Sequence, residues 1–315
     1  MLKSKSPEVL ILSKHAESYH SLIQSGLPQV VLHSTYTLEE ARRYSHSSVL
    51  LAEPNLGVEI LAAMPELKWY QSTWAGVTPL MAQGLRKDYL LTGVKDVFGP
   101  LISEYVLAYI LLFERHILEH RAAQKAKTWH PVLPGRLHGK TVGITGTGSI
   151  AQYLAQTLKP FGLKIKGYNT RGQTTAYFDT VYSQDDLPTF LAGCDYVVNT
   201  LPDTPQTYHL FNAHAFKGMP DHTLFINVGR GNAVDENALI KALEQNQLKA
   251  AILDVFSQEP LANHHPFWEN EKIWISSHTA APSFPEDIAK IFMRNYGKFI
   301  SGETLDYLID FEKGY

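Results

Sequence analysis

The chain lacks the features that stabilise secreted proteins or bind membranes and nucleic acids. It has one cysteine, Cys194, among 315 residues, which excludes an intrachain disulfide and fits a reducing compartment. The longest apolar run, residues 105–113, is far shorter than the ~20 residues that span a bilayer, and residues 8–13 are too short for a signal-peptide core. A formal net charge of −3 gives no long-range attraction for nucleic acid or anionic lipid. We therefore expect a cytoplasmic protein with Cys194 buried.

Short apolar runs alternate with amphipathic runs along two stretches of the chain, which predicts two α/β domains with parallel sheets covered by helices. The expected strands of the first stretch are residues 9–13, 29–34, 48–53, 67–72 and 89–94. Those of the second are residues 141–145, 164–169, 196–201, 223–228, 249–255 and 273–278. A long helix is predicted over 102–127, and a helical tail begins at Pro285.

A glycine-rich loop joins the strand 141–145 to a helix-like run. Its form is G-x-G-x-x-A, with Gly146, Gly148 and Ala151 at the small positions. Such a motif is also found in packed turns, but here a strand precedes it, a helix follows it and another strand arrives next, as a dinucleotide-binding loop requires. We predict that Gly146, Gly148, Ser149 and Ile150 bind the cofactor, because helix N-termini favour anions.

The residues after the next strand, Asn169, Thr170 and Arg171, indicate which dinucleotide binds. An acidic residue here would accept hydrogen bonds from the adenosine ribose, whereas the guanidinium of Arg171 can pair with a 2′-phosphate. The sequence therefore favours NADP(H), with NAD(H) possible. A solvated loop arginine is the alternative.

Polar residues follow three of the later predicted strands. They are Arg230, Asp254, Glu259 and His278. Singly, each fits a surface ion pair or a strand-end cap, but ligands of open parallel sheets bind outside the carboxyl ends of the strands. We expect these four side chains and the glycine loop to surround one crevice.

The chain resembles the D-isomer-specific 2-hydroxyacid dehydrogenases, and most of all their glyoxylate/hydroxypyruvate reductase branch. The resemblance covers nearly the whole chain through "PELKWYQSTWAGV", "GPLISEYVLAYIL", "GKTVGITGTGSIA", "NTLPDTPQT", "LFINVGRGNAVDENAL", "LDVFSQEPL" and "SSHTAAPS". It implies catalytic roles for Arg230, Glu259 and His278, a cofactor-side role for Asp254, and backbone amides at Ala75 and Gly76 for the substrate carboxylate. Trp74, beside them, departs from the family pattern and leaves the size of the substrate open.

The chemistry of a 2-oxo acid suits these residue types. Arg230 can hold its carboxylate and carbonyl, and His278 can donate a proton as general acid while the carboxylate of Glu259 favours the protonated ring. His278 also counts among the expected cofactor contacts. Five more follow later strands: Leu201, Pro202, Thr207, Val228 and Gly229.

The expected fold is therefore α/β, with a Rossmann-type doubly wound domain and a smaller flavodoxin-like domain. Residues 99–282 would form the dinucleotide-binding domain, and 1–98 with 283–315 the substrate domain. By resemblance, helix 102–127 contributes to a homodimer.

Two alternatives stand beside this interpretation. A nucleotide-sensing module can keep the fold without useful turnover. The run "HILEH" at 116–120 matches the H-x-x-E-H zinc-protease pattern, although it lacks a specified third ligand, and the pair His264 and His265 is a still weaker metal candidate. We predict no metal.

Overall fold

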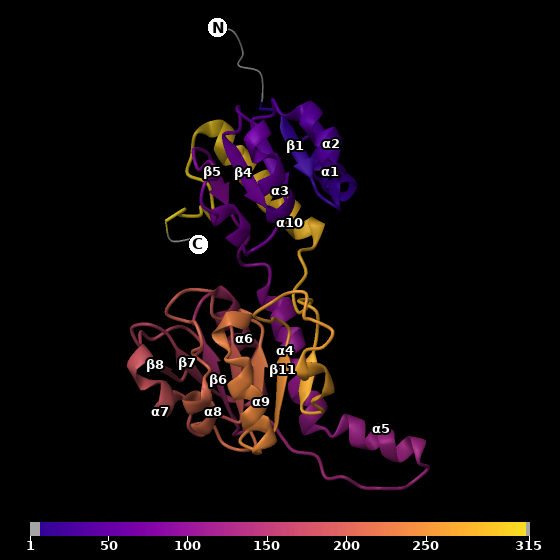
Figure 1. Cartoon of the computed structure of the whole chain (residues 1–315), viewed down its shortest axis with the longest axis vertical. Coiled ribbons are helices and arrows are strands. Elements are labelled where there is room, and N and C mark those ends of the chain that lie inside the picture. The colour runs from indigo at the N-terminus through magenta and orange to yellow at the C-terminus, as the bar shows by residue number, and fades with distance from the viewer. Residues whose placement is uncertain (1–6, 313–315) are drawn as a thin grey trace. The chain divides into compact units, whose positions relative to one another are not determined.

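The computed structural model describes residues 7–312, whose helices and strands are drawn in Figure 1. The chain divides into two compact units. The first takes in the chain up to Val97 together with the segment from Ser283 on, and the second spans Phe98–Pro282. Each unit is built on one parallel sheet with helices packed against it, so the predicted α/β class is confirmed.

The first unit has a five-stranded sheet in the order β2-β1-β3-β4-β5, the strand order of flavodoxin-like folds. Its strands are β1 (Val9–Leu12), β2 (Leu32–Thr35), β3 (Val49–Ala52), β4 (Trp69–Ser72) and β5 (Leu90–Thr92). Its helices are α1 (Ala16–Gly26), α2 (Leu38–Ala41), α3 (Pro54–Ile60) and α10 (Pro285–Ser301). The indole of Trp69 stacks on Phe292 with 5.1 Å between ring centroids, which places the returning helix α10 on this sheet (Figure 1).

The second unit has a seven-stranded sheet in the order β12-β11-β10-β9-β6-β7-β8, and all its neighbouring strands are parallel. Its strands are β6 (Thr141–Thr145), β7 (Lys164–Tyr168), β8 (Thr180–Tyr182), β9 (Tyr196–Asn199), β10 (Leu224–Asn227), β11 (Ala250–Leu253) and β12 (Ile273–Ile275). The order reverses between β6 and β9, which is the switch point at which doubly wound sheets bind ligands.

The helices of the second unit include the predicted long helix, which is divided in two. They are α4 (Gly99–Glu114), α5 (Ile117–Lys125), α6 (Ser149–Leu158), α7 (Leu187–Leu191), α8 (Ala213–Lys217) and α9 (Glu236–Glu244). None of the helices in the described part of the chain has both the length and the apolar character that a bilayer crossing requires.

The prediction of one continuous helix over 102–127 was wrong. His116 lies between α4 and α5 with a left-handed backbone, φ 49°, which ends the first helix. The carboxylate of Glu114 holds the end of α4 by pairing with Lys140 Nζ at 2.6 Å and accepting a hydrogen bond from Tyr196 Oη at 2.7 Å. Helix α5 buries no side chain and projects away from its unit (Figure 1), so packing does not keep it in line with α4.

The later strands end earlier than predicted because their backbone leaves the sheet at its carboxyl edge and no longer pairs with the neighbouring strands. Strands β9, β10, β11 and β12 end at residues 199, 227, 253 and 275, two or three residues short of the predicted ends except at 227. The predicted strand at 29–34 begins only at Leu32. Strand β8 is a short edge strand that the apolar pattern does not reveal.

Cys194 is fully buried in the turn between α7 and β9, as expected. Burial raises the pKa of its thiol to about 11, and Sγ donates a hydrogen bond to the carbonyl of Phe190. A thiol of this kind is a packing residue, because nucleophilic attack requires the thiolate.

Candidate functional site

The glycine loop lies between β6 and α6 and presents backbone amides to solvent. Gly146 has a φ of 87°, in the left-handed region that glycine tolerates, and its N–H donates to the carbonyl of Tyr168. No side chain caps the helix at Gly148, and a Cβ added there would meet no atom within 4 Å. The first amides of α6 therefore face open space, where the helix dipole favours an anion.

The loop after β7 is organised by the side chain of Asn169. Its Oδ1 accepts hydrogen bonds from the backbone N–H of Arg171 at 3.1 Å and of Gln173 at 3.2 Å. Its Nδ2 donates to Thr147 Oγ1, which belongs to the glycine loop. Thr170 and Arg171 are exposed, and among the described residues the guanidinium of Arg171 has no carboxylate partner. An unpaired cation is thus held beside the glycine loop.

Two buried asparagines, which the sequence analysis did not single out, connect the strand ends around the switch point. Thr145 Oγ1 donates to Asn199 Oδ1, and Asn199 Nδ2 donates to Asn227 Oδ1 at 2.9 Å. Asn227 Nδ2 in turn donates to the carbonyl of Arg230. The sequence does contain a signal for these two residues, because β9 and β10 each end in an asparagine after an apolar run. This network fixes the start of the segment that carries Arg230.

The imidazole of His278 and the carboxylate of Glu259 are in direct hydrogen-bond contact. Nδ1 of His278 lies 2.7 Å from Glu259 Oε2, while Glu259 Oε1 accepts a hydrogen bond from the N–H of Phe256 at 3.0 Å. Both carboxylate oxygens are therefore engaged. With Nδ1 occupied, Nε2 is the ring nitrogen that can meet a ligand.

Asp254 is buried beneath the loop that carries His278. Its Oδ1 accepts hydrogen bonds from Ser276 Oγ at 2.6 Å and from the N–H of Thr279 at 2.8 Å, and both of its oxygens accept from the N–H of Ala280 at 3.1 Å. The carbonyl of Asp254 also accepts from the N–H of His278 at 2.8 Å. Asp254 thus anchors the loop that carries His278, a role that was not predicted from the sequence.

A cavity of about 200 Å³ brings three of the predicted site residues together. It is lined by Asp203, Arg230, Gly231, Asn232, Phe256, Ser257, Glu259 and His278. Arg230 Nη1 donates to the carbonyl of Gly229 at 2.7 Å, and this is the one hydrogen bond of its side chain within residues 7–312. Burial lowers the pKa of Arg230, while nearby Glu259 and Asp203 raise it. The guanidinium keeps its charge at neutral pH and has donors available to an anion.

The other predicted cofactor contacts lie after the ends of β9 and β10. The N–H of Leu201 donates to Asn199 Oδ1, and Thr207 Oγ1 donates to the carbonyl of Pro202 at 2.7 Å. Val228 and Gly229 follow β10, where the N–H of Gly229 donates to Asn227 Oδ1. All five residues therefore lie at the carboxyl edge of the seven-stranded sheet.

Trp74, Ala75 and Gly76 belong to the first unit, where they follow the carboxyl end of β4. The hydroxyl of Ser72 shapes this turn by accepting from the N–H of Trp74 and donating to its carbonyl. Trp74 is 38% exposed. The part of this loop in substrate binding stays a prediction.

The zinc-protease interpretation of residues 116–120 required two histidines on one continuous helix. That premise is wrong, because His116 precedes α5 in a left-handed conformation and its Nδ1 lies 3.2 Å from Glu119 Oε1. His265 has a local partner as well, since its Nδ1 accepts from the N–H of Phe267. Neither motif belongs to a cluster of three potential metal ligands within residues 7–312.

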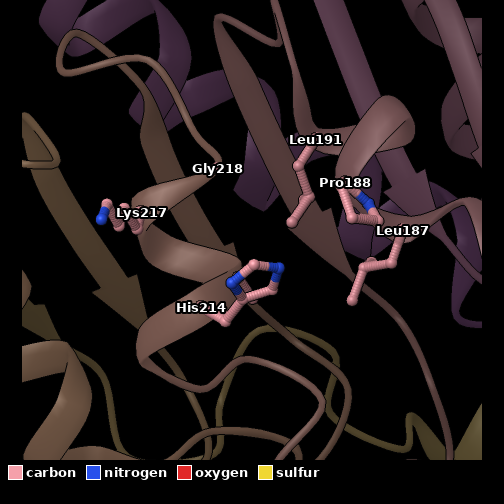
Figure 2. A pocket seen from close by; sticks show the side chains of 7 residues that line it. Leu187, Pro188, Leu191, His214, Lys217 and Gly218 are labelled. Atoms are coloured by element: carbon pink, nitrogen blue, oxygen red, sulfur yellow. The ribbon is translucent and has the colours of Figure 1, made fainter.

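A larger cavity of about 290 Å³ lies between α7 and α8 (Figure 2). Leu187, Pro188 and Leu191 form one side, and His214, Lys217 and Gly218 form the other. The lining is mostly aliphatic and contains no carboxylate. It therefore lacks the acid–base pair present in the smaller cavity, and we assign the candidate site to the smaller one.

Comparison with known proteins identifies the family. Residues 107–280 match the model of the D-isomer specific 2-hydroxyacid dehydrogenase NAD binding domain. A curated relative, glyoxylate/hydroxypyruvate reductase A of Yersinia enterocolitica, is 31% identical over 82% of this chain and 84% of its own length.

Two solved structures extend the similarity to almost the full chain. A D-isomer specific 2-hydroxyacid dehydrogenase family protein from Aeromonas salmonicida is 40% identical, with a TM-score of 0.94 over 97% of this chain and 99% of its own. An NADPH-dependent glyoxylate/hydroxypyruvate reductase from Sinorhizobium meliloti, solved with NADP and sulfate, is 26% identical, with a TM-score of 0.86 over 98% of this chain and 100% of its own. The chain belongs to the D-isomer-specific 2-hydroxyacid dehydrogenase family and is an NAD(P)-dependent oxidoreductase of that family.

Proposed function

We propose that this enzyme reduces small 2-oxo acids of the glyoxylate or hydroxypyruvate type to D-2-hydroxy acids with NADPH. The 2.7 Å contact between His278 Nδ1 and Glu259, on a cavity that also contains Arg230, carries the proposal. The relatives from Yersinia and Sinorhizobium, which are named as reductases of these two substrates, support the substrate class.

Arg230 binds the substrate in this proposal. A 2-oxo acid presents a carboxylate and an adjacent carbonyl, and the planar guanidinium matches both with parallel N–H donors. Because the one hydrogen bond that the Arg230 side chain makes to the described residues uses Nη1, further donors of the fork are left for the substrate. A cationic clamp next to the carbonyl also stabilises the negative charge that develops on its oxygen during reduction.

His278 is the proposed general acid. The carboxylate of Glu259 stabilises the imidazolium and holds the ring through Nδ1, so that Nε2–H can donate its proton to the substrate oxygen. A bound nicotinamide cofactor supplies the hydride. In the reverse direction, neutral His278 takes the proton from the hydroxyl group.

The residues around the glycine loop fit a dinucleotide with a 2′-phosphate. The uncapped amides at Ser149 and Ile150 would bind the pyrophosphate. The unpaired guanidinium of Arg171 would bind the 2′-phosphate, so NADP(H) is preferred and NAD(H) remains possible. The predicted contacts Asn169, Thr170, Leu201, Pro202, Thr207, Val228, Gly229, Asp254 and His278 complete the proposed cofactor site.

The first unit would provide the remaining substrate contacts. In this proposal, the backbone amides of Ala75 and Gly76 bind the substrate carboxylate, and the indole of Trp74 limits the size of the substrate. Residues 1–98 with 283–315 then act as the substrate domain, and residues 99–282 as the dinucleotide-binding domain.

We further propose that the enzyme works in the cytoplasm as a homodimer. An arm of the second unit, residues 117–136, carries exposed apolar side chains. Trp129 is 96% exposed and Leu133 87% exposed, and α5 projects from the unit in Figure 1. Apolar side chains gathered on a projecting arm favour burial against a second copy of the chain.

The proposal is tested by assaying a panel of small 2-oxo acids with NADPH and with NADH. We expect turnover of glyoxylate or hydroxypyruvate with a higher kcat/KM for NADPH, and a large loss of kcat/KM for these acids in Arg230→Ala. Tight NADPH binding without turnover of any 2-oxo acid would instead identify the nucleotide-sensing alternative.

A further inference from the structure

We infer that Glu8, His33 and His46 form a site for a divalent transition-metal ion, with Zn²⁺ as the best fit, in the first unit. Glu8 Oε2 lies 3.1 Å from His33 Nε2 and 3.0 Å from His46 Nε2. One ligand atom from each residue lies within 4.8 Å of the other two. The Nε2 atoms of both imidazoles thus point at Oε2 of Glu8.

The parallel sheet brings these residues together at the amino end of its strands. In the register of β1 and β2, Leu10 pairs with His33, so their side chains lie on the same face. Glu8 is two residues before Leu10 and therefore shares that face. The carbonyl of Glu8 accepts from the N–H of Val49, which fixes its backbone against β3. His46 comes from the turn just before β3.

The distances fit a chelate with small adjustments. Ligands at about 2.0–2.2 Å from zinc in a tetrahedral arrangement lie about 3.3–3.6 Å from one another, a few tenths of an ångström more than the observed separations of 3.0 Å and 3.1 Å. The ring of His33 is already held, because it stacks on Tyr44 with 4.1 Å between centroids and 12° between planes. Little conformational freedom would be lost on binding.

The donor set decides the class of ion. Two imidazole nitrogens and one carboxylate oxygen suit zinc and its neighbours, whereas magnesium and calcium prefer oxygen ligands alone. The His46 side chain is 58% exposed, so water can complete the coordination. The ion would join β1, β2 and the turn before β3. The proposed substrate loop at Trp74 follows the carboxyl end of this sheet, whereas the ion would lie at the amino end. We therefore assign the ion a stabilising role and not a catalytic one.

The test uses the full-length protein after treatment with a chelator. Zn²⁺ is titrated against a chromogenic competing chelator, Co²⁺ reports coordination through its absorption spectrum, and the melting temperature is measured with and without Zn²⁺. His46→Ala removes the exposed ligand with little effect on packing, and Glu8→Gln removes the carboxylate. His120→Ala and His264→Ala are matched controls, because they remove the histidines of the two other candidate motifs.

We expect wild type to bind one equivalent of Zn²⁺, to give a tetrahedral or five-coordinate Co²⁺ spectrum, and to melt at a higher temperature with Zn²⁺. Binding should weaken by about tenfold or more in His46→Ala and Glu8→Gln and persist in both controls. Unchanged affinity in His46→Ala, loss of binding in either control, or no binding by wild type would each overturn the assignment.

Discussion

At the scale of single residues, His278 combines an unusual backbone with a fixed side chain. Its φ of 55° lies in the left-handed region, which costs a non-glycine residue about 1–3 kcal/mol. The surrounding contacts hold it there, since its N–H donates to the carbonyl of Asp254 and its Nδ1 meets Glu259. Such a backbone conformation persists only where neighbouring contacts hold the residue in place. Here the strained residue is the proposed general acid itself.

Replacing His278 by Ala should lower kcat by about 10²–10⁴-fold, because the proton donor is lost. NADPH should still bind, as measured by fluorescence titration. His264→Ala, in an exposed loop of the same unit, is the matched control and should leave both quantities unchanged. A variant without His278 that retained wild-type kcat would remove this residue as the acid.

Replacing Arg171 by Ala should weaken NADPH binding far more than NADH binding. A charge-assisted pair with the 2′-phosphate exists only for NADPH, and its loss removes about 1.5–3 kcal/mol, or roughly 10–150-fold in Kd. Lys164→Ala removes an exposed cation at the other end of β7 and should not discriminate between the cofactors. Equal losses for NADPH and NADH in the Arg171 variant would refute the assignment.

At the scale of elements, the position of His278 depends on a loop pinned to the end of β11. Asp254 accepts four hydrogen bonds at its side-chain oxygens, from Ser276, Thr279 and Ala280. Tyr105 of α4 extends this network, because its hydroxyl lies 2.7 Å from Ser276 Oγ. The chain between β12 and α10 is thereby tied to α4.

Asp254→Asn should disturb this loop, because an amide nitrogen cannot accept from the backbone N–H groups it would face. Each buried group left unpaired costs about 1–3 kcal/mol, and a displacement of about 1 Å at His278 can lower kcat by about 10²-fold. Kinetics and thermal melting are measured together. Thr223→Val removes a buried hydrogen bond to the carbonyl of Cys194 at the amino end of the strands. This control should lower the melting temperature and leave kcat unchanged. If Asp254→Asn lost only stability, the anchoring role would be wrong.

At the scale of the whole molecule, folded-state burial suppresses the ionisation of a thiol and several phenols. Desolvation is the main cause in each case: it raises the pKa of Cys194 from 9.0 to about 11 and that of Tyr89 from 10.0 to about 12. The pKa values of Tyr19, Tyr70, Tyr105 and Tyr196 are raised well above 10.0 for the same first reason.

The free energy of unfolding should therefore fall as the pH rises above about 9. A raised folded-state pKa means that the unfolded chain loses its proton at a lower pH than the folded chain does. The stability that the group contributes is therefore complete below its unfolded-state pKa and is lost as the pH rises toward its folded-state pKa. Each such group removes up to about 1.4 kcal/mol per pH unit until its folded pKa is reached. Urea unfolding between pH 8 and 11 measures the slope, which Cys194→Ala should reduce above pH 9. A flat profile in wild type would contradict the prediction.

Assembly is the other property of the whole molecule that the structure makes testable. Placing Asp at both Trp129 and Leu133 should convert the proposed dimer to a monomer at micromolar concentration, because two charges would have to be buried. Sedimentation velocity measures the change. Ile300→Asp, at a position 57% exposed in the first unit, is the control and should sediment as wild type does. A monomeric wild type would exclude the homodimer.

Local sequence determined the parts of this protein whose physical causes are local. Alternation of apolar and polar runs predicted the two sheets, and the spacing of Gly146 and Gly148 between a strand and a helix predicted the turn that leaves the amides of α6 exposed. Such features depend on backbone conformation and on residues within a few positions, so one short segment contains the information.

Only the tertiary structure decided which distant groups touch. The fixing of His278 by Glu259 and Asp254 and the buried link from Asn199 to Asn227 arise from contacts between segments far apart in the chain. The gathering of Glu8, His33 and His46 depends likewise on strand register, which no single segment specifies. Side-chain contacts of this kind are set by how the elements pack, and sequence spacing alone does not contain that geometry.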